Sequence, residues 1–128
     1  MSVRSGMADT MRTDWVAIPD LAGVRVIATQ RALDEPSKPT ALITSRFLTK
    51  SPNLPNSYRH VGLMLTLISP HTDLDKAQDQ LDVIAEASLD YLEVQPHVLD
   101  IDPATTVGWD SSRLAFEIPF TVLAKKAE

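Results

Sequence analysis

Apolar residues between positions 72 and 93 recur every three or four positions, which is the spacing of a helix with one buried face. Thr72 suits the N-cap, because its side-chain oxygen can accept a hydrogen bond from a free backbone N–H. Pro96 disfavours helical geometry in the residue before it, so the helix must end upstream. We therefore predict one long amphipathic helix over about residues 72–93. Its apolar stripe consists of Leu74, Ala77, Leu81, Ile84, Ala85, Tyr91 and Leu92, completed by Gln78 and Ser88.

The segments on either side of this helix alternate between apolar and polar residues with a period of two, as strands do. They predict strands at residues 24–29, 41–50, 58–68, 105–109 and 113–125. A short helix is predicted at residues 7–16, and Pro19 ends it. Proline, asparagine and serine separate the second strand from the third, so these two strands form a hairpin with a long polar tip at residues 49–58. The last two strands form a closing hairpin.

Two of these strands also predict something about their neighbours. Residues 58–68 are apolar on both faces, which is typical of a central strand covered on both sides. Because only one long helix is predicted, another subunit is one candidate for the second covering layer. Residues 113–125 contain Pro119, which donates no ladder hydrogen bond, so we predict an edge strand open to pairing with another chain. The pattern as a whole predicts one α+β domain over residues 1–128, with a mixed, mostly antiparallel sheet packed by the long helix.

Composition narrows the class of protein. An apolar share of 44% and a charged share of 23% are ordinary for a soluble globular domain. The chain has no cysteine, which excludes disulfides, thiolate nucleophiles and zinc–thiolate sites. The longest apolar run, residues 61–68, is too short to span a bilayer, and residues 1–15 lack the apolar core of a signal peptide. We therefore expect synthesis in the cytoplasm and no contact with a membrane.

Candidate catalytic and metal-binding residues are sparse. The three histidines, His60, His71 and His97, do not have the spacing of metal ligands. Asp100 and Asp102 are interpreted as a capped turn, because no further oxygen ligands or glycine complete a calcium loop. Four glycines in the whole chain do not build a phosphate-binding loop or a nucleophile elbow. We predict that the protein is not an enzyme and uses no cofactor and no metal.

The net charge of −5 is unevenly distributed. Residues 71–110 contain ten acidic side chains and one base, whereas residues 36–69 contain four bases and no acid. One interpretation is a solvated acidic helix face. The other is complementarity between neighbouring copies, because opposite patches on one chain favour head-to-tail association. No cluster of basic residues on one element indicates binding to duplex DNA.

The order of these elements, from a short helix through a strand, a hairpin with a long tip and an amphipathic helix to a closing hairpin, resembles that of a known protein family. That family is the tail terminator, or tail completion, proteins of long-tailed bacteriophages (siphoviruses). The resemblance covers about residues 23–126. The stretches that carry it are GVRVIATQ, PTALITSRF, YRHVGLMLTLISPHTDLDKAQDQLDVIAEASLDYL and SSRLAFEIPFTVLAKK.

The resemblance implies a structural virion protein without catalytic activity. Members of the family form six-membered rings at the head-proximal end of the tail tube. The ring stops polymerisation of the tube and presents its other face to the head-completion, or neck, proteins. DNA passes through the lumen without sequence-specific binding. The expected partners are other copies of the chain, the major tail tube protein and the neck protein, and the expected location is the head–tail junction of the virion.

The family shares no motif from which site residues can be transferred, so the interface candidates rest on physical arguments. Three basic residues on the first hairpin suit an acidic neighbour, residues of the hairpin tip suit a neighbouring subunit or the tube, and the predicted edge strand suits packing between subunits. These candidates are Arg46, Lys50, Asn53, Asn56, Tyr58, Arg59, Glu117 and Pro119.

Alternative functions come from other classes of protein. One is another neck, connector or tail subunit of a phage particle. Others are a small α+β domain that binds a small molecule or acts as an enzyme, and a cytosolic adaptor that binds one charged partner. The second class requires polar residues that converge in an apolar pocket, and the adaptor would be a stable monomer at high concentration.

Overall fold

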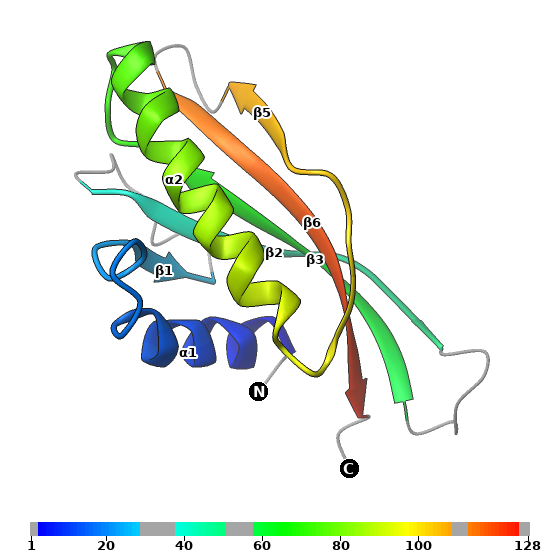
Figure 1. The fold of residues 1–128 in the computed structure, drawn as a ribbon. Coiled ribbons are helices and arrows are strands. Elements are labelled where there is room, and N and C mark those ends of the chain that lie inside the picture. The colour runs from blue at the N-terminus through cyan, green and yellow to red at the C-terminus, as the bar shows by residue number, and fades with distance from the viewer. Residues whose placement is uncertain (1–2, 29–37, 51–57, 109–112, 126–128) are drawn as a thin grey trace.

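The computed structural model describes residues 3–28, 38–50, 58–108 and 113–125. Within these ranges, two helices lie on a six-stranded, mostly antiparallel sheet, which confirms the predicted α+β class (Figure 1). The elements in chain order are α1 (Val3–Trp15), β1 (Arg25–Ile27), β2 (Thr40–Lys50), β3 (Tyr58–Ile68), α2 (Leu74–Glu93), β4 (Val98–Ile101), β5 (Thr105–Gly108) and β6 (Leu114–Lys125).

The strands are arranged in the order β1-β2-β3-β6-β4. On the side of β6 that faces away from β3, β4 pairs with the C-terminal half of β6 and β5 pairs with its N-terminal half. Only β1 and β2 run parallel; every other described pair is antiparallel. The predicted central position of β3 is confirmed, since this strand lies between β2 and β6. The predicted hairpin of the last two strands is confirmed as well, because β5 pairs antiparallel with β6.

Both helices cover the same face of the sheet, and the hydrophobic core lies between them and that face (Figure 1). Ile43, Leu65 and Ile118 form one row across β2, β3 and β6, and all three are fully buried. Leu81 of α2 is fully buried against the same face. Each such side chain contributes about 1.5–3 kcal/mol of transfer free energy, so the helix layer and the sheet stabilise each other.

The helix α2 matches its prediction except at its first turn. Asp73, not Thr72, is the N-cap: its Oδ1 accepts hydrogen bonds from the backbone N–H of Asp75 (3.0 Å) and Lys76 (3.3 Å). A carboxylate satisfies two free N–H groups and also interacts favourably with the positive end of the helix dipole. The predicted stripe is buried from Ala77 onward except at Gln78, which is half-buried, whereas Leu74 is 60% exposed and does not belong to it.

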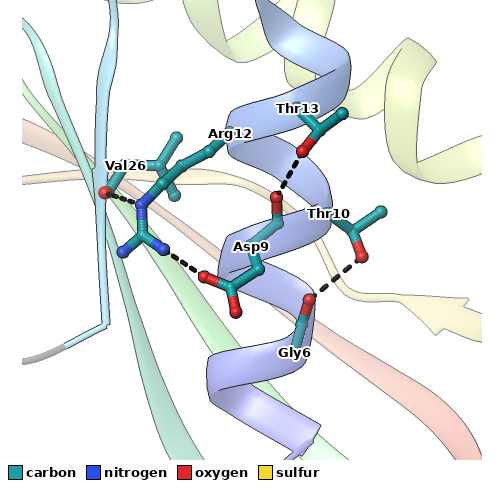
Figure 2. A network of polar contacts seen from close by, with 6 residues as sticks. All are labelled: Gly6, Asp9, Thr10, Arg12, Thr13 and Val26. Carbon is teal, nitrogen blue, oxygen red and sulfur yellow. Dashed lines mark hydrogen bonds and ion pairs between the residues drawn. The ribbon is translucent and has the colours of Figure 1, made fainter.

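The helix α1 begins one turn before its predicted start and is bound to the sheet by polar contacts. Figure 2 shows that Arg12 donates from Nε to the Val26 carbonyl of β1 (2.9 Å) and also pairs with Asp9. The Thr10 and Thr13 hydroxyls donate to carbonyls one turn earlier in the helix. The threonine bonds lie within the helix, so α1 is held against the sheet by the Arg12–Val26 bond together with its buried side chains, Met7, Ala8, Met11 and Trp15.

The prediction of an edge strand at Pro119 is wrong, because β6 is an inner strand. On one side β6 pairs with β3 along its whole length. On its other side β4 ends at Ile101 and β5 begins at Thr105, so the ladder is interrupted opposite Pro119. There the Asp102 N–H donates to the Pro119 carbonyl (2.8 Å). Proline has no N–H to donate to a neighbouring strand. It therefore fits at a break between two strands as well as at the edge of a sheet.

The strand β4 was not predicted; its sequence, with Asp100 and the following Asp102, was interpreted as a turn. In the structure Val98 pairs with Val122 and Ile101 with Phe120, with a register shift between them. The strand has only four residues, three of them apolar, so its periodic signal is weak and the acidic residues favoured a turn in the sequence. Asp100 instead lies within the strand, opposite Thr121.

Candidate interaction surfaces

The strands β2 and β3 pair along their whole length, from Thr40 opposite Ile68 to Lys50 opposite Arg59. This confirms the predicted hairpin strands. The predicted tip residues Asn53 and Asn56 lie outside the described residues, and so does the side chain of Lys50. The two candidates at the start of β3 are described. Tyr58 and Arg59 are half-buried, and Arg59 donates from Nη1 to the Tyr58 carbonyl (2.8 Å).

A β-bulge interrupts β2 at Arg46. Ser45 is opposite Leu63, but the next pair is Phe47 opposite Gly62, so Arg46 is the extra residue. Side chains that follow a bulge change face. The strict alternation predicted for residues 41–50 is therefore wrong beyond Ser45, and the helix face of the sheet receives Leu48 in place of Phe47.

The Phe47 ring lies over Gly62 of β3, on the face of the sheet opposite the helices. A Cβ atom at Gly62 would collide with this ring, so the close contact requires glycine. The Arg46 guanidinium carbon lies 5.2 Å from the centroid of the same ring. Arg46 also forms an ion pair with Asp102 (Nη1 to Oδ2, 3.6 Å), which lies beyond β6. The bulge thus directs Arg46 across the face of the sheet that lies opposite the helices, which we call the second face.

Asp102 contacts two of the interface candidates predicted from the sequence, Arg46 and Pro119. Its carboxylate pairs with Arg46, and its backbone N–H binds the Pro119 carbonyl. Both candidates therefore take part in contacts within the chain. Glu117, the third candidate on this face, is half-buried and lies opposite Thr66. The sequence did not predict this arrangement, because Asp102 was assigned to a turn.

The second face of the sheet divides into a buried and a partly open half. Leu42, Thr66 and Ile68 are buried within the chain itself, with exposed fractions of 1%, 4% and 0%. Another subunit is therefore not needed to cover that half of the face. Towards the bulge, Met64 is half-buried and Phe47 is 44% exposed.

A groove of about 660 Å³ lies on the helix side of the molecule, between the C-terminal half of α2 and the segment that follows α1. We call it the acidic groove. Three carboxylates line it, and no basic residue does. Its lining is Ile18, Asp20, Val83, Glu86, Ala87, Asp90, Tyr91 and Val94. Val83 and Val94 are 50% and 75% exposed, so apolar surface lies open beside the carboxylates.

Tyr91 fixes the floor of the acidic groove by joining α2 to α1. Its hydroxyl donates to Oδ2 of Asp14 (2.6 Å), and its ring packs edge-on against Trp15 at 6.0 Å between centroids and 87° between planes. Burial raises the pKa of Tyr91 well above its usual range, and the hydrogen bond to Asp14 and the charge of that carboxylate raise it further. Tyr91 therefore stays protonated and acts as a hydrogen-bond donor.

A second surface, which we call the basic corner, lies at the other end of α1. Its shallow hollow is lined by Val3, Arg4, Ser45, Arg46, Phe47, Leu48 and Val61. No acidic residue lines it, and the Leu48 side chain is 69% exposed. Arg4 forms no ion pair with any other residue that the structure describes. The bulge creates this corner, because it places Leu48 on the same face as α1.

The described residues contain no group of three or more histidine, aspartate or glutamate side chains that could hold a metal ion. Neither α1 nor α2 has the length and hydropathy that crossing a bilayer requires. Comparison with protein-family models finds no match to the chain, and comparison with curated proteins finds none either.

Proposed function

We propose that this protein is a structural subunit of a long-tailed phage virion, a tail terminator that assembles into a ring on the head-proximal end of the tail tube. The observation that carries the proposal is the order of elements: α1, the short strand β1, the hairpin of β2 and β3, α2, the short strand β4, and the hairpin of β5 and β6. Apart from β4, this is the order of elements on which the resemblance was drawn from the sequence. The stretches that carry the resemblance contain β1, β3 and β6 and most of β2 and α2, whereas α1, β4 and β5 lie outside them.

Surface features are compatible with assembly. The hairpin strands β2 and β3 are 11 residues each, so they extend about 35 Å at the usual rise per residue. The ends of these strands next to the hairpin tip, where Thr49 is opposite His60 and Lys50 is opposite Arg59, suit contact with a neighbouring subunit or with the tube. Separate acidic and basic surfaces on one chain favour head-to-tail contacts between copies.

Termination follows from an asymmetry between the two sides of such a ring. One side binds the last ring of tube subunits by shape and charge. The other side offers no surface on which a further tube ring can add, and it binds the neck protein instead. DNA passes through the lumen without sequence-specific contacts. The protein is made in the host cytoplasm and resides at the head–tail junction.

The first test is the mass of the purified protein by light scattering across a concentration series, with electron microscopy of the most concentrated fraction. We expect either closed rings or a monomer that forms rings when tail tubes are added. A protein that stays monomeric and does not bind tail tubes at any concentration would refute the proposal. It would favour a small binding domain, for which the acidic groove is the candidate site.

A further inference from the structure

The acidic groove and the basic corner are complementary in charge, and both present apolar surface. The groove carries Asp20, Glu86 and Asp90 around the exposed Val83. The basic corner carries Arg4 beside the exposed Leu48, and no carboxylate lines it. An apolar anchor surrounded by opposite charges is the usual composition of a specific protein contact.

The two surfaces cannot meet within one molecule. Arg4 lies in the first turn of α1, whereas Ile18 and Asp20 follow its last turn. A helix of 13 residues is about 20 Å long, and this length separates the surfaces. They therefore lie at different places on the surface, so a contact between them joins two copies.

We propose that the acidic groove of one copy receives the basic corner of the next. Leu48 enters the groove beside Val83, and Arg4 faces the carboxylates of Glu86 and Asp90. The contact is heterologous, since each copy uses a different surface for each neighbour, and repeating it generates a ring when the rotation closes. This inference rests on the proposed function, because it identifies the surfaces through which the ring subunits associate.

Arg46 contributes less to this contact than Arg4. Its guanidinium is already paired with Asp102 and lies against the Phe47 ring. Reversing its charge would disturb these contacts within the chain as well as any contact with a neighbour. Arg4 is therefore the better residue for a test, together with Glu86, which is exposed on α2.

The test is a charge exchange between two variants, measured by light scattering and electron microscopy under the conditions in which the wild type forms rings. Glu86→Arg and Arg4→Glu should each weaken self-association at least about tenfold, because each places like charges opposite one another. An equimolar mixture of the two variants should regain association, because the arginine groove of one variant then faces the glutamate corner of the other. Rings in the mixture would alternate the two variants.

Matched substitutions separate this contact from general effects of charge and hydrophobicity. Asp79→Arg changes the same charge on α2 outside the groove and should leave association unchanged. Leu48→Ala should weaken association, whereas Leu74→Ala removes a comparably exposed leucine elsewhere and should not. Circular dichroism should show that each variant keeps its fold.

The outcomes distinguish the two proposals. Rings of wild-type strength from Glu86→Arg or from Arg4→Glu would overturn the inference and leave the terminator proposal intact. Variants that weaken association but do not restore it when mixed would show that the two surfaces contact something other than each other, which also overturns it. A wild type that forms no ring, with or without tail tubes, would refute both proposals.

Discussion

The hydrogen bond between Tyr91 and Asp14 offers the sharpest test of how the two helices are joined. Tyr91→Phe removes the hydroxyl but keeps the ring that packs against Trp15, so it isolates the 2.6 Å bond from the aromatic contact. A hydrogen bond to a charged acceptor contributes about 1.5–3 kcal/mol, and the half-buried position of Asp14 places this bond near the lower end. We expect the free energy of unfolding to fall by about 1–2 kcal/mol.

Urea denaturation followed by circular dichroism measures this loss, and a double-mutant cycle with Asp14→Asn assigns it to the pair. The coupling energy between the two substitutions should be about 1 kcal/mol, because both remove the same charged hydrogen bond. A coupling energy within error of zero would refute the reasoning, since it would mean that the two side chains act independently.

The same pair gives a pH dependence. Because burial and Asp14 raise the pKa of Tyr91 in the folded state, the folded protein holds this proton at a pH where the unfolded chain, with its ordinary pKa of 10.0, has lost it. The stability that the protonated tyrosine provides is complete below pH 10 and declines as pH rises above it. The wild type should therefore lose its advantage over Tyr91→Phe above pH 10, and an advantage that stays constant would contradict the assignment.

Two further predictions test the helix register and the bulge. Leu81→Asp should unfold the domain, because it removes a fully buried leucine and buries a charge at a combined cost of about 5 kcal/mol or more. The control Val83→Asp changes a half-exposed residue of the same helix and should remain folded in thermal denaturation. A folded Leu81→Asp variant would show that the helix register is wrong. Gly62→Ala should lower the free energy of unfolding by about 1 kcal/mol, because the added Cβ displaces the Phe47 ring. In a Phe47→Ala background the same change should lower it less. Equal losses in chemical denaturation would mean that the ring does not lie over Gly62.

The sequence predicted the elements whose periodic signal is long. Over twenty residues the stripe around Leu81 leaves little choice of register, and the alternation of β3 and β6 identifies both strands. The helix start was wrong by one residue because Thr72 and Asp73 are adjacent and both are good N-caps. Only the backbone geometry distinguishes them.

The missed features depend on contacts between distant parts of the chain. The sequence does not reveal the bulge at Arg46, because Phe47 and Leu48 are both apolar and either of them could face the helices. Pro119 indicates a missing ladder partner, but the sequence does not say whether that position is an edge or a break between two strands. The acidic groove joins Asp20 to Glu86 and Asp90, which only the packing of α1 against α2 brings together. The sequence signal for the acidic groove was Val83, an apolar residue off the predicted stripe, which is 50% exposed in the structure.

The length of tail tubes assembled in the presence of this protein shows whether it ends their growth, as we propose. Tail-tube subunits of the proposed parent phage would be polymerised with and without the protein, and electron microscopy would record the lengths and ends of the tubes. If the protein is a tail terminator, it forms a ring on one end of each tube, and capped tubes do not elongate when fresh subunits are added. Tubes that carry no ring and continue to elongate as they do without the protein would contradict this proposal.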